Sequence, residues 1–224
     1  ILMYGEMGIY YHVSTKKIWS ICSPIILVGG TIGNGLSVLV MTRKGLRHST
    51  TSFLYIVLAF ADTSHLWIGL LRQHLFYSHG YNFRLNSEWA CKVHVFFTHL
   101  TWHLCSWILV LINFERLISV FVPHRSKIWF SHKTICLMIG NLTIVLIAAN
   151  SHYFITYDIA ISKKSKLKYC AEVKQYNDFI DWIWPWLESI IVSVLPFLLI
   201  LICNVSIICR VAYTNYKRKH GLGN

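Results

Sequence analysis

Residues 108–123 read ILVLINFERLISVFVP and place Glu115 and Arg116 side by side in an otherwise almost wholly apolar run. The run lies within a longer apolar stretch, about residues 91–122, which as a helix is long enough to cross a hydrocarbon core of roughly 30 Å. Charged side chains inside a membrane are costly, and they usually lie at the interface or serve a function. The stretch therefore predicts a membrane-spanning helix whose acid–base pair needs an explanation.

The composition of the whole chain indicates a membrane protein. Of its 224 residues, 55% are hydrophobic and only 13% are charged, which is too apolar for an ordinary soluble domain. Apolar stretches of about 20 residues or more recur along the chain, at about 18–41, 52–75, 91–122, 134–154 and 182–213. Their length, and the lack of short alternating segments, favour helices over barrel strands. We therefore predict an all-α membrane protein, a transmembrane helix bundle.

The charged residues lie mostly between these stretches. Residues 1–17 are predicted as an N-terminal segment, 18–216 as the transmembrane bundle, and 217–224 as a basic cytoplasmic tail that includes Lys217 to Lys219. Lysines and arginines divide almost evenly between the two sets of connections, so the positive-inside rule barely decides the orientation. The formal net charge of +12 needs no nucleic acid to explain it, and the lipid bilayer is the expected partner.

Cysteine positions give a stronger indication of orientation. Cys91, at the start of the third span, and Cys170, in the long loop before the fifth, lie on the same side as the N-terminus. Two cysteines at one face suggest a disulfide in an oxidising compartment, which makes that face extracellular; the alternative is two free thiols. The predicted location is the plasma membrane, with several spans and an extracellular N-terminus. The remaining cysteines lie inside predicted spans and are expected to be small buried residues: Cys22, Cys105, Cys136, Cys203 and Cys209.

The position of the acid–base pair follows from the length of its helix. Arg116 comes 25 residues after Cys91, which places it about 37 Å along the helix and beyond the far edge of the hydrocarbon core. Glu115 and Arg116 are therefore expected at the cytoplasmic interface. Taken alone, the pair is best explained as an arginine at a helix end that reaches the headgroups beside a neighbouring acid.

An ordered set of short motifs changes that interpretation. In chain order the set comprises GNGLSVLV (33–40) with Asn34, LYIVLAFAD (54–62) ending in Asp62, Trp89 two residues before Cys91, Glu115-Arg116-Leu117 with Pro123 seven residues after the arginine, and Pro196 in the fifth span. With these spacings the chain resembles the rhodopsin-like G-protein-coupled receptors over about residues 18–216. The sequences of the second and third spans most resemble those of invertebrate neuropeptide receptors.

The resemblance implies roles for several of these residues. Glu115 and Arg116 would be the activation switch, because in the family the acid–arginine pair holds the inactive state and the arginine is freed toward the G protein. Asn34 and Asp62 would form a polar core in which Asp62 binds a sodium ion. Cys105 stands where the family usually has a serine, which argues against sodium, and no metal is predicted.

Residues at the outer ends of the spans indicate the ligand class. Amine receptors carry an aspartate 18 residues before the switch arginine, and here that residue is Thr98, which argues against an amine ligand. The expected ligand-binding residues combine charge with aromatic surface, which suits a peptide: Arg72, Thr98, His99, Trp102 and Glu188. The loop segment SKKSKLKYCAEV (162–173) would add a basic rim. For each residue individually, packing or anchoring at the membrane interface explains it equally well.

The expected function is a G-protein-coupled receptor that binds an extracellular neuropeptide and activates a heterotrimeric G protein, with no catalytic residues and no cofactor. The sequence contains no counterpart of the sixth and seventh helices of the family, and we expect the chain ending at Asn224 not to signal by itself. Two alternatives stay open: a five-helix protein that associates with full-length receptors without signalling, and a small transporter, although no segment recurs as an internal repeat. A metalloenzyme is disfavoured, because His94, His99 and His103 lie only loosely on one face with no accompanying carboxylate.

Overall fold

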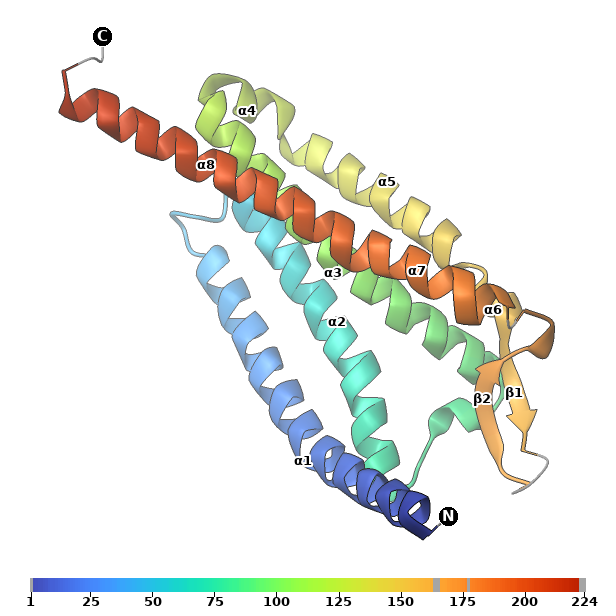
Figure 1. The fold of residues 1–224 in the computed structure, drawn as a ribbon. Helices are drawn as coiled ribbons and strands as arrows, with labels where there is room; N and C mark the ends of the chain where they lie inside the picture. The colour runs from blue at the N-terminus through green and yellow to red at the C-terminus, as the bar shows by residue number, and fades with distance from the viewer. Residues whose placement is uncertain (1, 163–165, 177, 222–224) are drawn as a thin grey trace.

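The computed structural model describes residues 2–162, 166–176 and 178–221. Within these residues, five helices are long and apolar enough to cross a membrane: Thr15–Met41, Thr50–His79, Glu88–Phe121, His132–Thr156 and Phe179–Lys219. They form an elongated bundle with a two-stranded hairpin at one end (Figure 1). The predicted helix bundle with five spans is therefore confirmed. Ile1 of the predicted N-terminal segment and residues 222–224 of the predicted basic tail lie outside the described residues.

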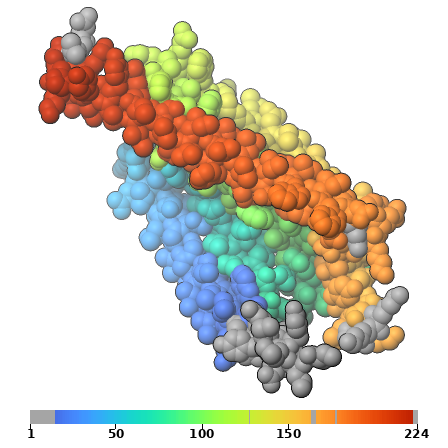
Figure 2. All heavy atoms as spheres, viewed as in Figure 1, coloured from blue at the N-terminus to red at the C-terminus, as the bar shows by residue number. Residues whose placement is uncertain are grey.

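The helices and strands follow one another in a simple order. They are α1 (Leu2–Met41), α2 (Thr50–His79), η1 (Phe83–Leu85), α3 (Glu88–Phe121), α4 (Pro123–Trp129), α5 (His132–Asn150), α6 (Tyr153–Thr156), β1 (Tyr157–Ile161), β2 (Lys168–Glu172), η2 (Lys174–Tyr176), η3 (Phe179–Ile183), α7 (Trp184–Ser189), η4 (Ile190–Val194) and α8 (Leu195–Lys219). The elements from η3 to α8 form one helical run, which appears as a continuous ridge along the molecule (Figure 2).

Several helices extend beyond the apolar stretches that predicted them. α1 begins at Leu2 rather than near residue 18, α2 continues to His79, and the last helical run continues to Lys219. A run of apolar residues marks only the part of a helix that lies in lipid, whereas the backbone hydrogen bonds continue into polar residues. The starts of α3 and α5 are fixed by the N-cap residues Ser87 and Ser131, whose side chains accept a hydrogen bond from a backbone amide of the first turn.

α3 is the central helix of the bundle. It contacts α2, α5 and α8, whereas α1 packs chiefly against α2. Two apolar cores lie along α3. One contains Val95, Phe96, Leu100, Leu146, Tyr153, Ile180 and Trp184, and the other contains Leu54, Leu58, Ile108, Ile112, Phe130 and Ile135. Because α3 contributes to both cores, its two ends are held by different neighbours.

The last helical run departs from α-helical geometry in two places. η3 and η4 are π-helical segments, and each ends two residues before a proline, Pro185 or Pro196. A proline has no N–H to donate, so the preceding turn loses a regular hydrogen bond and can take up one extra residue. The extra residue rotates the side chains that follow. Glu188 on α7 lies between the two segments, so its direction could not be read from regular helical spacing.

The outer surface of the bundle is apolar, as a lipid-facing surface must be. In α1 only 6% of the most apolar window is buried within the protein. Three cysteines that were expected to be buried, Cys22, Cys136 and Cys209, are exposed on this surface, whereas Cys203 is buried and Cys105 half-buried. That expectation was wrong for the first three because a thiol is apolar enough to face hydrocarbon.

The structure contains the disulfide between Cys91 on α3 and Cys170 on β2, with a Cα–Cα distance of 5.7 Å. β1 and β2 pair antiparallel, with Ile159 opposite Cys170. An ion pair of 3.3 Å between Lys92 and Asp158 joins the other strand to the first turn of α3. Both strands of the hairpin are thus attached to the same end of α3, which we call the disulfide end.

We predict that Cys170→Ser destabilises the protein. The bond closes a loop with a sequence separation of 79 residues, and in the chain-entropy model its removal costs about 4 kcal/mol. The expected result is a lower apparent melting temperature of the purified protein and less protein at the cell surface. Cys136→Ser, which removes an exposed free thiol, is the matched control and should behave like the wild type. Labelling of Cys91 and Cys170 by a maleimide without prior reduction would contradict the bond.

Candidate functional site

The structure brings together two of the predicted ligand-binding residues at the disulfide end. His99 on α3 and Glu188 on α7 are hydrogen-bonded through Nδ1 and Oε1. The Tyr153 hydroxyl donates to the same oxygen at 3.5 Å, and His103 Nε2 lies 3.6 Å from it. Glu188 therefore joins α3, α6 and α7 at one point. We call this group of residues, together with Asn150 and Trp184 described next, the Glu188 cluster.

A second layer of hydrogen bonds supports the Glu188 cluster. Trp184 Nε1 donates to the Tyr153 hydroxyl at 2.7 Å, and Asn150 Nδ2 donates to His103 Nδ1 at 2.8 Å. Because His103 Nδ1 accepts the bond from Asn150, a neutral His103 carries its proton on Nε2, the nitrogen directed at Glu188. Asn150 is 0% exposed, and Tyr153 and His103 are each 1% exposed. The cluster is therefore a buried polar network inside an apolar bundle.

Sequence reasoning found part of this cluster and missed part. The expectation that no carboxylate accompanies the histidines was wrong, because Glu188 lies beside His99 and His103 although it is far along the chain. Asn150 and Tyr153 were missed; a polar asparagine late in an apolar span was the available signal. In the part of the chain that the structure describes, no group of three or more His, Cys, Asp or Glu side chains could hold a metal ion. At this cluster the direct contact between His99 and Glu188 leaves no room for an ion between them.

The other predicted ligand-binding residues lie outside the Glu188 cluster. Trp102 is 43% exposed, with its ring centroid 6.4 Å from that of His99. The Thr98 hydroxyl donates to the carbonyl of His94, one turn earlier on α3, at 2.7 Å. Arg72 is half-buried on α2 and has no hydrogen bond or ion pair with the described residues.

A second basic side chain lies near Arg72. Arg84 on η1 donates through Nε to His94 Nδ1 at 2.7 Å, and His94 Nε2 donates to the carbonyl of Ile68 at 2.9 Å. One ring nitrogen of His94 therefore accepts a hydrogen bond and the other donates one, which is the arrangement of a neutral imidazole. Burial, together with the smaller effect of the positive charge of Arg72, lowers the pKa of Arg84 to about 10. Arg72 on α2 and Arg84 in the connection that follows α2 therefore place two positive charges near each other.

The predicted polar core is arranged differently from the expected pair. Asn34 Nδ2 on α1 donates to the Thr63 hydroxyl on α2 at 3.1 Å. Asp62 interacts instead with the thiol of Cys105 on α3. Adjacent residues on a helix point about 100° apart, so Thr63 meets α1 while Asp62 meets α3. Among the described residues, no hydrogen bond joins Asn34 to Asp62.

The acid and the base of the predicted switch point in different directions at the opposite end of α3, which we call the Glu115 end. Glu115 is 4% exposed and accepts hydrogen bonds from Thr51 at 2.9 Å and from Ser119 at 3.3 Å. Arg116 is exposed; it donates to the Tyr55 hydroxyl, and its guanidinium lies 5.3 Å from the centre of that ring. The ion pairs within the described residues do not include one between Glu115 and Arg116.

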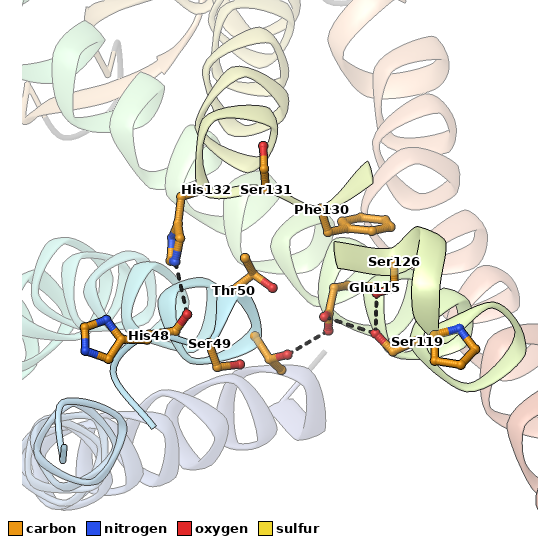
Figure 3. A pocket seen from close by; sticks show the side chains of 11 residues that line it. His48, Ser49, Thr50, Glu115, Ser119, Ser126, Phe130, Ser131 and His132 are labelled. Carbon is orange, nitrogen blue, oxygen red and sulfur yellow. Dashed lines mark hydrogen bonds between the residues drawn. The ribbon is translucent and has the colours of Figure 1, made fainter. Parts of the chain in front are cut away.

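A cavity of about 650 Å³ lies beside Glu115 (Figure 3). Its lining is rich in hydroxyl groups and comprises His48, Ser49, Thr50, Thr51, Glu115, Ser119, Pro123, Ser126, Phe130, Ser131 and His132. The Ser119 and Ser126 hydroxyls are 2.8 Å apart, which connects α4 to the Glu115 carboxylate through Ser119. His132 Nε2 lies 3.3 Å from the carbonyl of His48. Glu115 is therefore the point at which α2, α3 and α4 meet.

Comparison with known proteins matches residues 33–221 to the 7 transmembrane receptor (rhodopsin family). The chain is 31% identical over 115 residues to a neuromedin U receptor homolog of Caenorhabditis elegans, covering 47% of this chain and 28% of the relative. It is 26% identical over 146 residues to a galanin-like G-protein coupled receptor of Caenorhabditis elegans, covering 63% of this chain and 33% of the relative. It is also 31% identical over 110 residues to galanin receptor 2b of Danio rerio, covering 48% of this chain and 28% of the relative. The chain spans about a third or less of the length of these curated relatives.

We predict that Tyr153→Phe destabilises the helix bundle at the disulfide end. The change leaves the buried Trp184 Nε1 without its acceptor and removes a donor to Glu188, which costs about 1–3 kcal/mol. The apparent melting temperature of the purified protein, measured by size-exclusion chromatography after heating, should fall by about 2–10 °C. Tyr169→Phe is the control, because Tyr169 is exposed on β2. Equal melting temperatures of Tyr153→Phe and wild type would contradict the role of the hydroxyl.

Proposed function

Because the chain belongs to the rhodopsin family of seven-transmembrane receptors, we propose that it binds an extracellular peptide and in response activates a heterotrimeric G protein. The observation that carries the peptide assignment is the combination of residues at the disulfide end. There Glu188 is hydrogen-bonded to His99 beside the exposed ring of Trp102, and Arg72 has no carboxylate partner among the described residues. Aromatic surface beside a few charges suits a peptide.

The relatives support the same ligand class. Their names refer to neuromedin U and galanin. Thr98, which replaces the aspartate expected in an amine receptor, is engaged with the backbone of its own helix and offers no charge to an ammonium group. Arg72, Thr98, His99, Trp102 and Glu188 are the proposed ligand-binding residues.

We propose that the disulfide end is extracellular and the Glu115 end cytoplasmic, in the plasma membrane. Disulfides persist in oxidising compartments, which supports this orientation. α1 begins at the disulfide end, where Trp19 stacks on Tyr77 of α2, so the N-terminus would be outside. α8 reaches the Glu115 end, where Arg210 lies over the ring of Phe121. The basic residues that follow, Lys217 to Lys219, would then lie in the cytoplasm, as the positive-inside rule favours.

We propose Glu115 and Arg116 as the activation switch, and Asn34 and Asp62 as its polar support inside the bundle. Glu115 holds α2 and α4 to α3, and Arg116 is held by Tyr55 rather than by an acid. A single hydrogen bond from an exposed guanidinium is readily exchanged. Arg116 would therefore be available to a G protein once the helices around it move.

The ligand class predicts the response of cells that express the receptor from its complete coding sequence. With a second-messenger reporter, peptides of the neuromedin U and galanin types and a wider peptide library should include at least one agonist. A panel of small amines should produce no response, because Thr98 provides no carboxylate. Cells carrying the empty vector are the control. A response to amines alone would overturn the ligand assignment, and signalling by none of the compounds would count against the receptor function.

The proposed switch predicts a separation of binding from signalling. Arg116→Ala should abolish G-protein activation by a peptide that activates the wild type, while binding of that peptide falls less than about threefold, because the residue is remote from the disulfide end. Arg43→Ala, which removes an exposed arginine from the connection between α1 and α2, is the control and should signal normally. Full activation of Arg116→Ala at normal surface expression would eliminate this residue from the switch.

A further inference from the structure

Arg72 carries a positive charge that the described part of the protein does not neutralise. Its side chain is half-buried on α2, and the ion pairs of the described residues involve other groups. A guanidinium that loses water on burial is normally given a carboxylate or several acceptors in return. Arg72 has neither within those residues. An unsatisfied charge at the outer end of a membrane helix is therefore available to a ligand.

Arg84 is held next to the same position by His94. His94 bridges from Arg84 to the carbonyl of Ile68, with distances of 2.7 and 2.9 Å. Arg72 follows Ile68 by four residues, so it lies on the same face of α2, about 6 Å further toward the disulfide end. The effect of Arg72 on the pKa of Arg84 agrees with this proximity. Arginine side chains stay protonated at neutral pH, and for Arg84 even the lowered pKa of about 10 is well above it.

Three carboxylates of the elements near Arg84 are engaged elsewhere, and a fourth, Glu88 at the start of α3, is exposed to solvent. Asp158 pairs with Lys92 at 3.3 Å, and Glu172 accepts a hydrogen bond from the Tyr157 hydroxyl at 2.7 Å. Glu188 belongs to its own cluster with His99. Burial of Tyr157, together with the neighbouring Glu172, raises its pKa, so its hydroxyl stays protonated and adds no negative charge beside Arg84. Among the described residues, neither arginine is therefore paired with a carboxylate.

We propose that Arg72 and Arg84 form a binding site for a carboxylate of the peptide ligand, an inference that rests on the proposed function. A guanidinium offers parallel N–H donors that match the two oxygens of a carboxylate. The bond from Nε to His94 fixes the Arg84 side chain and leaves its terminal NH₂ groups for the ligand. His94 is then a positioning residue. A bound carboxylate also cancels the repulsion between the two positive charges, which gives the site its preference for an anion.

The first test needs no peptide agonist. The probe is N-acetyl-L-phenylalanine at millimolar concentration, and N-acetyl-L-phenylalaninamide is its neutral control. The acid should raise the apparent melting temperature of the purified receptor by about 2–4 °C, and the amide should not. The shift should disappear in Arg72→Gln and in Arg84→Gln but persist in Arg43→Gln, which changes an exposed arginine at the other end. Arg72→Lys, which keeps the charge, should retain part of the shift, and this variant serves if the glutamine variants fold poorly. Equal shifts with acid and amide, or a full shift in Arg72→Gln, would overturn the proposal.

The second test uses any peptide that activates the receptor. Each agonist is prepared with a free or an amidated C-terminus, and with Asp or Glu replaced by Asn or Gln, which distinguishes a terminal carboxylate from a side chain. Removing the recognised carboxylate should weaken binding to the wild type by about 10- to 100-fold and leave binding to Arg72→Gln unchanged. Equal losses in both receptors would contradict the site. If no peptide activates the receptor, the proposed function fails, whereas the thermal test with the acid probe still decides whether the carboxylate site exists.

Discussion

A carboxylate inside an apolar bundle must be given hydrogen-bond donors, and much of the polar structure of this protein follows from that requirement. Burial removes the water that stabilises the charge, and the penalty is recovered only if protein donors replace it. Glu115 obtains donors from Thr51 and Ser119, and Glu188 obtains one from His99. In both cases at least one donor comes from another helix, so each acid fixes the arrangement of helices around it, one near each end of α3.

Outside the lipid-facing region, different interactions hold the chain in place. The hairpin is attached to the first turn of α3 by the Cys91–Cys170 bond and by the Lys92–Asp158 ion pair. The connection between α2 and α3 is attached by the hydrogen bond from Arg84. Segments restrained in this way lose little further entropy when a ligand binds, which favours affinity. The disulfide end therefore combines a fixed backbone with side-chain charges that are incompletely paired.

The spans and their class could be predicted from sequence because apolar length is a property of each segment alone. The positions of Cys91 and Cys170 were equally informative, since only a membrane topology was needed to bring them to one face. The Glu188 cluster could not be predicted from the sequence, for a physical reason. Which residue meets His99 depends on the rotation of a helix 89 residues later in the chain, and that rotation is altered by π-helical segments. The sequence likewise placed Glu115 and Arg116 together, whereas consecutive residues on a helix diverge, so that each finds its own partners.

The two polar sites are connected by one uninterrupted helix. His99 and Glu115 are 16 residues apart on α3, about 24 Å along the axis. Signalling requires two conformations of the bundle that differ in their affinity for the ligand. A rigid helix by itself has a single conformation, so it cannot supply both. We propose that the side-chain bonds at its ends provide the second. In this proposal a ligand group that bonds to Glu188 would compete with His99 and loosen α3 from α7. A displacement of α3 would then change the geometry of the bond between Thr51 and Glu115. Because a buried acid needs hydrogen-bond donors, a change of partner at one end would favour a matching rearrangement at the other.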